Sequence, residues 1–280
     1  MPELPEVETI KNALVKGIGN CQIRQIEIRN FRLRERIPED LAVKICNSKV
    51  VCYKRIAKYI VIELNNGLSL IWHMGMSGKI KISDELPREL DKHDHVVIKT
   101  DKGYIIYNDP RRFGVFTYCE TDKVDKNHLF RRVGIDPFNE ELSAKYLFGC
   151  LQKKKRTPIK IALLDQNIIA GIGNIYASEI LYESKILPMR LSRDVSLAEC
   201  EILIKNIRKV LERAIAAGGS TLRDYKKPDG SLGYFQNMHC VYDKIGKKCP
   251  RCVCDIEKTG GIKKIVQAGR STFYCERLQK

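Results

Sequence analysis

The chain has 280 residues, of which 44% are hydrophobic and 30% charged, a composition typical of one large or two modest globular domains. No apolar run approaches the ~18 residues that a membrane helix needs, and no basic-then-apolar signal segment opens the chain, so we expect a cytoplasmic protein without membrane contact. The 50 Lys and Arg outweigh the 34 Asp and Glu, giving a net charge of +16.

This basic excess is uneven along the chain. Residues 1–130 carry 22 basic and 18 acidic side chains, a net of +4, whereas residues 131–280 carry 28 and 16, a net of +12. Such an excess marks a polyanionic partner such as nucleic acid, or a membrane surface. A soluble protein that is merely basic can have the same net charge, so charge alone favours a nucleic-acid partner only modestly.

The N-terminal stretch "MPELPEVETI" predicts the start of a helix over residues 5–17, ended by glycines at 17 and 19. Proline suits the first helical turn, and the acids Glu3 and Glu6 complement the positive end of the helix dipole. A second interpretation is chemical: removal of Met1 leaves a free secondary amine on Pro2, beside the Glu3 carboxylate. Glu6 follows one helical turn later and can share that site.

Residues 21–118 alternate in short strand-like runs separated by hairpin signals such as "NNG" and "DKG", which predicts a β-sandwich or barrel. "RRVGIDPFNEE" suggests a boundary. Beyond it we expect helices at 140–152, 157–166, 173–185 and 196–217, and then a polar, glycine-containing loop at 218–238.

Basic and glycine-rich segments in the helical part indicate contact with a nucleic-acid backbone. "AGIGN" places a tight turn before the first turn of a helix at Asn174, and the exposed N–H groups of a helix N-terminus bind phosphate. "KKKRTPIK" (153–160) supplies basic side chains nearby in sequence. The turn alone is also common as an ordinary elbow between helices.

Eleven cysteines divide into two groups. Six are scattered and are interpreted as free thiols of a reducing compartment: Cys21, Cys46, Cys52, Cys119, Cys150 and Cys200. The remainder crowd the last forty residues, where Cys249 and Cys252 in "CPRC" have the spacing of a zinc knuckle and Cys275 adds a third thiol. Leu278 stands at the fourth position, so either Cys254 (or Cys240 or His239) completes a Zn²⁺ site, or the hairpin packs without metal.

Taken together, these segments resemble the formamidopyrimidine-DNA glycosylases, bacterial base-excision enzymes that remove 8-oxoguanine and ring-opened purines. The matching segments run the full length: "MPELPEVET", "RIAKYI", "HMGMSG", "KHDHV", "YNDPRRFG", "LLDQNIIAGIGNIYASE", "GGSTLRDY" and "AGRSTFYC". The resemblance implies an α+β multidomain fold. Its parts are a catalytic β-sandwich flanked by helices (1–134), a helix-two-turn-helix domain (135–238) with a lesion-recognition loop (218–238), and a zinc-finger-like hairpin (239–280). A monomer acting on double-stranded damaged DNA is expected.

The resemblance also implies roles for individual residues. Pro2 is the nucleophile that forms a Schiff base, Glu3 the general acid or base, Lys58 the proton donor for β-elimination, and Arg270 a phosphate ligand that assists δ-elimination. Met76, Arg111 and Phe113 fill the space left by the extruded base. The remaining DNA contacts are His73, His93, Arg112, Lys155, Lys160, Asn174 and Tyr242, and the lesion loop offers Ser220, Thr221 and Tyr225.

Two rival functions stay open. An endonuclease VIII-like enzyme shares the Pro–Glu start and removes oxidised pyrimidines, although "PELPEVET" and the set Met76, Arg111 and Phe113 favour the purine enzyme. A non-catalytic DNA-binding relative with a degenerate finger would fit Leu278, whereas intact Pro2, Glu3 and Lys58 argue against it.

Overall fold

A computed structural model describes residues 2–220, 233–253 and 255–280. The chain forms two compact units, residues 1–131 with 215–236 and residues 132–214 with 237–280. Within the described ranges, no helix is both long and apolar enough to cross a membrane.

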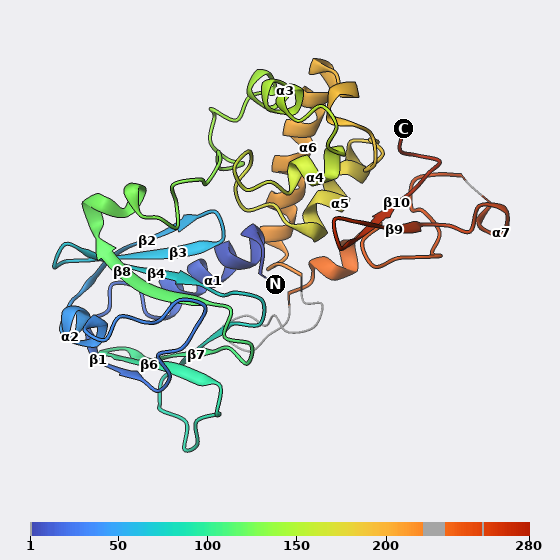
Figure 1. The fold of residues 1–280 in the computed structure, drawn as a ribbon. Coiled ribbons are helices and arrows are strands. Elements are labelled where there is room, and N and C mark those ends of the chain that lie inside the picture. The colour runs from blue at the N-terminus through green and yellow to red at the C-terminus, as the bar shows by residue number, and fades with distance from the viewer. Residues whose placement is uncertain (1, 221–232, 254) are drawn as a thin grey trace. The chain divides into compact units, whose positions relative to one another are not determined.

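The first unit is built on a β-sandwich, which decides between the two architectures that the strand pattern allowed (Figure 1). One sheet has the order β1-β6-β7-β5 and the other β2-β3-β4-β8, and every pairing is antiparallel. The strands are β1 (Ile23–Ile28), β2 (Val50–Ile56), β3 (Tyr59–Leu64), β4 (Leu68–His73), β5 (Lys79–Ser83), β6 (Asp94–Thr100), β7 (Gly103–Asn108) and β8 (Val115–Glu120). The short helix α2 (Leu41–Ile45) and a 3₁₀ turn, η1 (Thr121–Lys126), complete this unit's regular elements before residue 131.

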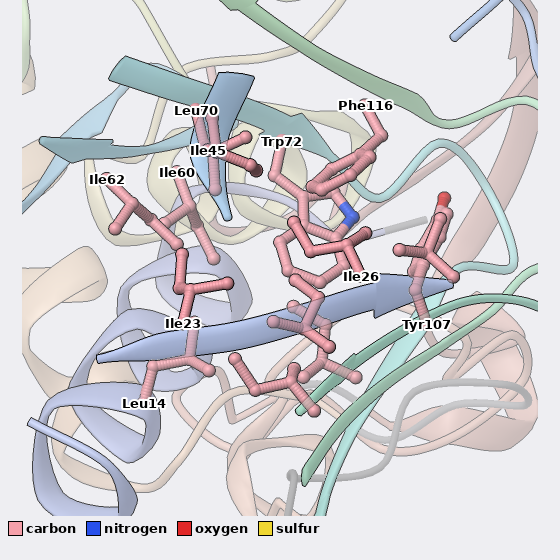
Figure 2. Packing of buried hydrophobic residues seen from close by; sticks show 14 of the residues in the cluster. Leu14, Ile23, Ile26, Ile45, Ile60, Ile62, Leu70, Trp72, Tyr107 and Phe116 are labelled. Carbon is pink, nitrogen blue, oxygen red and sulfur yellow. The ribbon is translucent and has the colours of Figure 1, made fainter. Parts of the chain in front are cut away.

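The sandwich core is apolar and closely packed. Trp72 on β4 has no exposed surface and packs against Tyr107 of β7 and Phe116 of β8, with ring centroids 5.3 and 4.8 Å away (Figure 2). The three rings join strands of both sheets, so they fix how the sheets stack. Burying aromatic rings of this size contributes several kcal/mol, at ~25 cal/mol per Å² of apolar surface.

Helix α1 (Leu4–Gly17) confirms the predicted N-terminal helix. Its inward face, with Val7, Ile10 and Leu14, belongs to the same core cluster as the strands. Arg55 on β2 also pairs with Glu8, with Nε 2.8 Å from the carboxylate. The helix start is therefore held at a fixed place against the sandwich.

The four predicted helices all form, and each is shorter than expected. They are α3 (Ala144–Lys153), α4 (Ile159–Leu163), α5 (Asn174–Glu183) and α6 (Leu197–Ala216). They lie in the second unit apart from the last two residues of α6. Helix α3 begins at 144 rather than 140 because the Ser143 hydroxyl accepts the N–H of Tyr146 and caps it. Helix α4 starts only after Pro158 and ends at Leu163. Short 3₁₀ turns, η2 (Ser192–Asp194) and η3 (Phe235–Met238), lie on either side of α6 in sequence.

The C-terminal segment forms a hairpin of β9 (Lys263–Gln267) and β10 (Arg270–Tyr274), preceded by the short helix α7 (Ile256–Thr259). Gln267 pairs with Arg270, so Ala268 and Gly269 form a two-residue turn. Both have positive φ (47° and 72°), as type I′ hairpin turns require. The turn places Arg270, whose side chain is exposed, at the very start of β10.

Candidate active site and nucleic-acid interface

Helix α1 begins directly behind Pro2, and its first turn holds two almost fully buried carboxylates. Glu3 and Glu6 form a capping box, in which the Glu3 N–H donates to Glu6 Oε2 at 2.9 Å. Glu3 is 3% exposed and Glu6 2%. The box fixes the backbone of Glu3, and so it also fixes where the preceding residue, Pro2, lies at the start of the helix.

The second oxygen of Glu6 reaches a distant part of the same unit. The Ser220 N–H donates to Glu6 Oε1 at 2.7 Å. Gly219 has φ +77°, and a Cβ there would lie 2.8 Å from the same oxygen. The entry to the predicted lesion loop is thus tied to the N-terminal helix. Thr221 and Tyr225, predicted for that loop, lie outside the described residues.

Lys58 lies in the tight turn between β2 and β3, after Ala57, whose φ is +53°. Its charge acts on His73, which sits opposite Tyr59 in the neighbouring strand register. Burial first, and then Lys58, lower the pKa of His73 to about 4. The imidazole is therefore neutral at physiological pH. Because Nδ1 accepts the Gly75 N–H at 3.0 Å, Nε2 carries the proton and can donate outward.

Met76, Arg111 and Phe113 project from two turns of the sandwich. Met76 is 39% exposed and Phe113 44% exposed, so neither is a core residue, as the turn-like "DPRRFG" predicted. The Arg111 guanidinium lies over the Phe113 ring, 4.8 Å from its centroid. Such flexible apolar, planar cationic and flat aromatic groups suit insertion into a base stack.

The remaining predicted DNA contacts differ in accessibility. Lys155 and Arg112 are exposed, and His93 is half-buried. Arg112 has φ +57°, a left-handed conformation that is uncommon for a residue other than glycine.

Lys160 has no exposed surface. Its ammonium donates to Asn174 Oδ1 and Thr272 Oγ1, both at 2.7 Å, and to the Ser271 carbonyl at 3.0 Å. Asn174 in turn donates to the same carbonyl at 2.9 Å. Lys160 and Asn174 thus join the helices to β10, directly beside Arg270. The sequence predicted a direct DNA contact for Lys160 and did not indicate this burial.

Sequence reasoning did not single out Glu179, which positions Tyr242. The Glu179 carboxylate is 2% exposed and accepts three consecutive backbone N–H groups, those of Cys240, Val241 and Tyr242, at 2.8 to 3.0 Å. Burial raises the pKa of Glu179, and these N–H groups oppose that shift. The Tyr242 hydroxyl lies 3.4 Å from the Asn174 amide. "IYASE" contained this glutamate, but nothing in its pattern indicated three backbone partners.

The structure brings the three predicted thiols of the finger together. The sulfur atoms of Cys249, Cys252 and Cys275 lie within 4.8 Å of one another, so this group could hold a metal ion. The Tyr182 hydroxyl lies 3.2 Å from Cys249 Sγ. Leu278 packs against the surrounding apolar cluster, in which Tyr182, Ile262 and Phe273 are buried. Cys254 lies outside the described residues.

Two family models match this chain. The model for the formamidopyrimidine-DNA glycosylase N-terminal domain matches residues 1–116, and the model for the formamidopyrimidine-DNA glycosylase H2TH domain matches residues 133–226. Fold and site therefore define a DNA glycosylase of base excision repair.

Relatives cover the whole chain. A formamidopyrimidine-DNA glycosylase of Rhodospirillum rubrum is 42% identical and one of Agrobacterium fabrum 41% identical, each over 100% of both chains. A Lactococcus lactis FPG variant bound to DNA containing Fapy-dG is 34% identical, with a TM-score of 0.90 over 100% of both chains. The MutM (FPG) protein of Thermus thermophilus is 31% identical, with a TM-score of 0.86 over 99% and 98% of the two chains. The chain belongs to the formamidopyrimidine-DNA glycosylase family.

Proposed function

We propose that this chain excises oxidised purines, 8-oxoguanine and formamidopyrimidines, from duplex DNA, using Pro2 as nucleophile, and then cleaves the strand by β,δ-elimination. The observation that carries the proposal is the buried capping box of Glu3 and Glu6, which fixes the start of α1 directly after Pro2. The solved Lactococcus lactis relatives bound to Fapy-dG DNA and to abasic-site DNA support the substrate class.

The chemistry uses the amine that removal of Met1 exposes. An α-amine with an ordinary pKa near ~8 is partly unprotonated at neutral pH. Its lone pair attacks C1′ as the glycosidic bond breaks, and the base departs with a proton that an acid supplies. The nitrogen then loses its proton, and protonation of O4′ breaks the C1′–O4′ bond, which opens the sugar ring and leaves an iminium at C1′. This iminium remains cationic without a proton on nitrogen, so it accepts the electron pair when the C2′ proton is removed. The 3′ phosphate leaves in that step and the 5′ phosphate in the next.

The neighbouring side chains have roles that match their positions. Glu3, adjacent to the amine, exchanges protons with the sugar. Lys58 donates a proton in the β-elimination, and Arg270, exposed at the hairpin turn, binds phosphates and assists the δ-step. His73, Arg112 and Asn174 contact the DNA backbone, as do His93, Lys155 and Tyr242. Phe113 wedges the base stack, Met76 fills the vacancy, and Arg111 pairs with the orphaned cytosine.

We propose further that the finger binds structural Zn²⁺ through Cys249, Cys252 and Cys275. The 3.7 Å between the Cys252 and Cys275 sulfurs is close to the ~3.8 Å expected for two thiolates on one tetrahedral zinc. When bound, the ion would fix the fold of the finger and take no part in the reaction. Leu278 offers no ligand atom, and among the described residues neither Cys240 nor His239 lies in the group of three thiols, so a fourth ligand would come from solvent or Cys254. The protein is proposed to act as a monomer in the cytoplasm.

Borohydride trapping tests the proposal. The Met1-processed protein is incubated with duplex DNA carrying 8-oxoguanine opposite cytosine, reduced, and examined on a denaturing gel. A covalent adduct that maps to Pro2 is expected, and Glu3→Gln should abolish turnover while Glu27→Gln, at an exposed glutamate of β1, should not. No adduct, with DNA binding intact, would leave a DNA-binding protein without the chemistry.

A parallel dihydrouracil substrate tests the second candidate, an enzyme for oxidised pyrimidines. That candidate is favoured by a specific finding, because the Lactococcus lactis relative has also been solved with DNA containing an oxidised pyrimidine. A higher trapping rate on dihydrouracil than on 8-oxoguanine would support it over the purine enzyme.

A further inference from the structure

Asp109 is a buried carboxylate between the two turns that carry Met76, Arg111 and Phe113. Its side chain has no exposed surface. Oδ1 accepts the Ser77 hydroxyl at 2.6 Å, and Oδ2 accepts the Gly114 N–H at 2.9 Å and the Tyr107 hydroxyl at 3.1 Å. The Asp109 carbonyl also lies 2.8 Å from His95 Nε2. No part of the mechanism described above uses this carboxylate.

Each of the three exposed residues is connected to this carboxylate through a neighbouring residue that hydrogen-bonds to it. Ser77 directly follows Met76, and Gly114 directly follows Phe113. The Arg111 N–H donates to Ser77 Oγ at 3.2 Å, so Arg111 is linked to the Asp109 carboxylate through the Ser77 hydroxyl. Hydrogen bonds to a charged acceptor are shorter and about twice as strong as neutral ones, and burial strengthens them further. The carboxylate therefore couples the positions of all three.

The two turns pack closely against each other. A Cβ at Gly75 would collide with the Phe113 backbone, and one at Gly114 would collide with the Tyr107 hydroxyl. Burial and the neighbouring Asp109 raise the pKa of Tyr107 well above its ordinary value, so its hydroxyl stays a donor. The two turns are thus packed together and share the hydrogen bonds of one buried carboxylate.

We propose that Asp109 is a positioning residue that holds Met76, Arg111 and Phe113 in the arrangement needed to replace an extruded base. This inference rests on the proposed function. Extrusion costs a few kcal/mol of pairing and stacking, which inserted side chains recover only when their placement is accurate. A displacement of about 1 Å in a catalytic arrangement can lower a rate by ~10²-fold. The loss of Asp109 should therefore affect the extrusion of a base more than the chemistry at Pro2.

The test compares two substrates in single-turnover assays. One duplex carries 8-oxoguanine opposite cytosine, and the other carries a preformed abasic site, which has no base to extrude. Asp109→Asn keeps the size of the side chain but exchanges one acceptor oxygen for a donor NH₂. We expect excision of 8-oxoguanine to fall by ~10²-fold, while cleavage at the abasic site changes by less than about threefold. Discrimination between cytosine and adenine opposite the lesion should fall in parallel, because Arg111 is displaced.

Milder variants guard against misfolding of Asp109→Asn. Ser77→Ala and Tyr107→Phe each remove one donor and should show the same preferential loss on 8-oxoguanine. Ser69→Ala and Tyr118→Phe are matched controls, because their hydroxyls bond at 2.9 Å to Thr121 and at 2.7 Å to Asp40, elsewhere in the sandwich. Equal losses on both substrates, or no loss, would overturn the inference. Failure of the wild-type protein on both substrates would instead overturn the proposed function.

Discussion

Replacing Thr272 by valine should destabilise the finger almost as much as removing the buried Lys160 charge. Lys160→Met deletes the ammonium and its hydrogen bonds to Asn174, Ser271 and Thr272, but it also removes the cost of burying a charge, which is several kcal/mol. Asn174 and Ser271 keep their mutual bond. The net cost should be about 2–4 kcal/mol, less than the sum of three charged hydrogen bonds at ~1.5–3 kcal/mol each.

Thr272→Val leaves the ammonium in place and removes one of its acceptors at 2.7 Å. A hydrogen bond to a charged group contributes about 1.5–3 kcal/mol. Because Lys160 has no exposed surface, solvent cannot replace the lost acceptor. The valine variant should therefore lose about 2 kcal/mol, although it changes only one hydroxyl. Thr9→Val is the matched control: it removes a neutral bond to the Pro5 carbonyl at 2.8 Å within α1 and should cost about 1 kcal/mol.

Native-state hydrogen exchange provides the measurement, because it resolves the opening free energy of β9 and β10 separately from that of the sandwich. Since about 1.4 kcal/mol is a factor of ten, we expect exchange in the hairpin to accelerate about 30-fold in Thr272→Val and ~30–1,000-fold in Lys160→Met. The sandwich should be unchanged in both variants, while DNA affinity falls as Arg270 loses its support. If Thr272→Val exchanged like the wild type while Lys160→Met did not, the ammonium would not depend on this hydroxyl, and the reasoning would be refuted.

Three further outcomes follow from the site. His73 has a folded-state pKa of about 4, below its ordinary 6.5, so the unfolded chain binds a proton first as the pH falls from 6.5 towards 4. Stability should be full above that window and fall within it by up to about 3 kcal/mol, and His73→Asn should reduce this pH dependence in urea titrations. Glu6→Gln weakens the acceptor of the Glu3 and Ser220 N–H groups, so thermal unfolding should show a loss of about 1–2 kcal/mol, whereas unchanged stability would contradict this role. A chelator that removes zinc should accelerate amide hydrogen exchange in the finger and leave exchange in the sandwich unchanged. A metal assay that finds no zinc in the purified protein would exclude the metal.

Much of the fold could be predicted from the sequence because its elements are locally encoded. Period-2 apolar alternation identified the strand-rich half, and glycines at 17 and 19 ended α1 where expected. The helix boundaries near residues 140 and 157 were wrong because a serine cap and a proline, which act over one turn, decided them. The β-sandwich could not be separated from a barrel, since closure depends on which distant strands pair.

The candidate site also combines features that local sequence predicts with features that depend on residues far apart in the chain. Exposure of Met76 and Phe113 followed from a turn motif. The three finger thiols meet as their spacing indicated. The burial of Lys160, in contrast, depends on partners 111 and 112 residues away, and a lysine in a basic run is ordinarily a surface residue. Asp109 was visible in "YNDPRRFG", but its three donors come from two separate turns and a strand that only the folded chain brings together.

The finger is not an interchangeable module. Its hairpin is joined to the helices by the ammonium of Lys160 and the amide of Asn174, neither of which belongs to the finger in sequence. A chimaera that exchanged only residues 239–280 with those of a relative would combine the relative's β10 with the Lys160 and Asn174 of this chain. That strand and those two side chains would not have evolved together. Recombination between such genes should succeed when the crossover lies before position 160, so that the two side chains and the strand are inherited together.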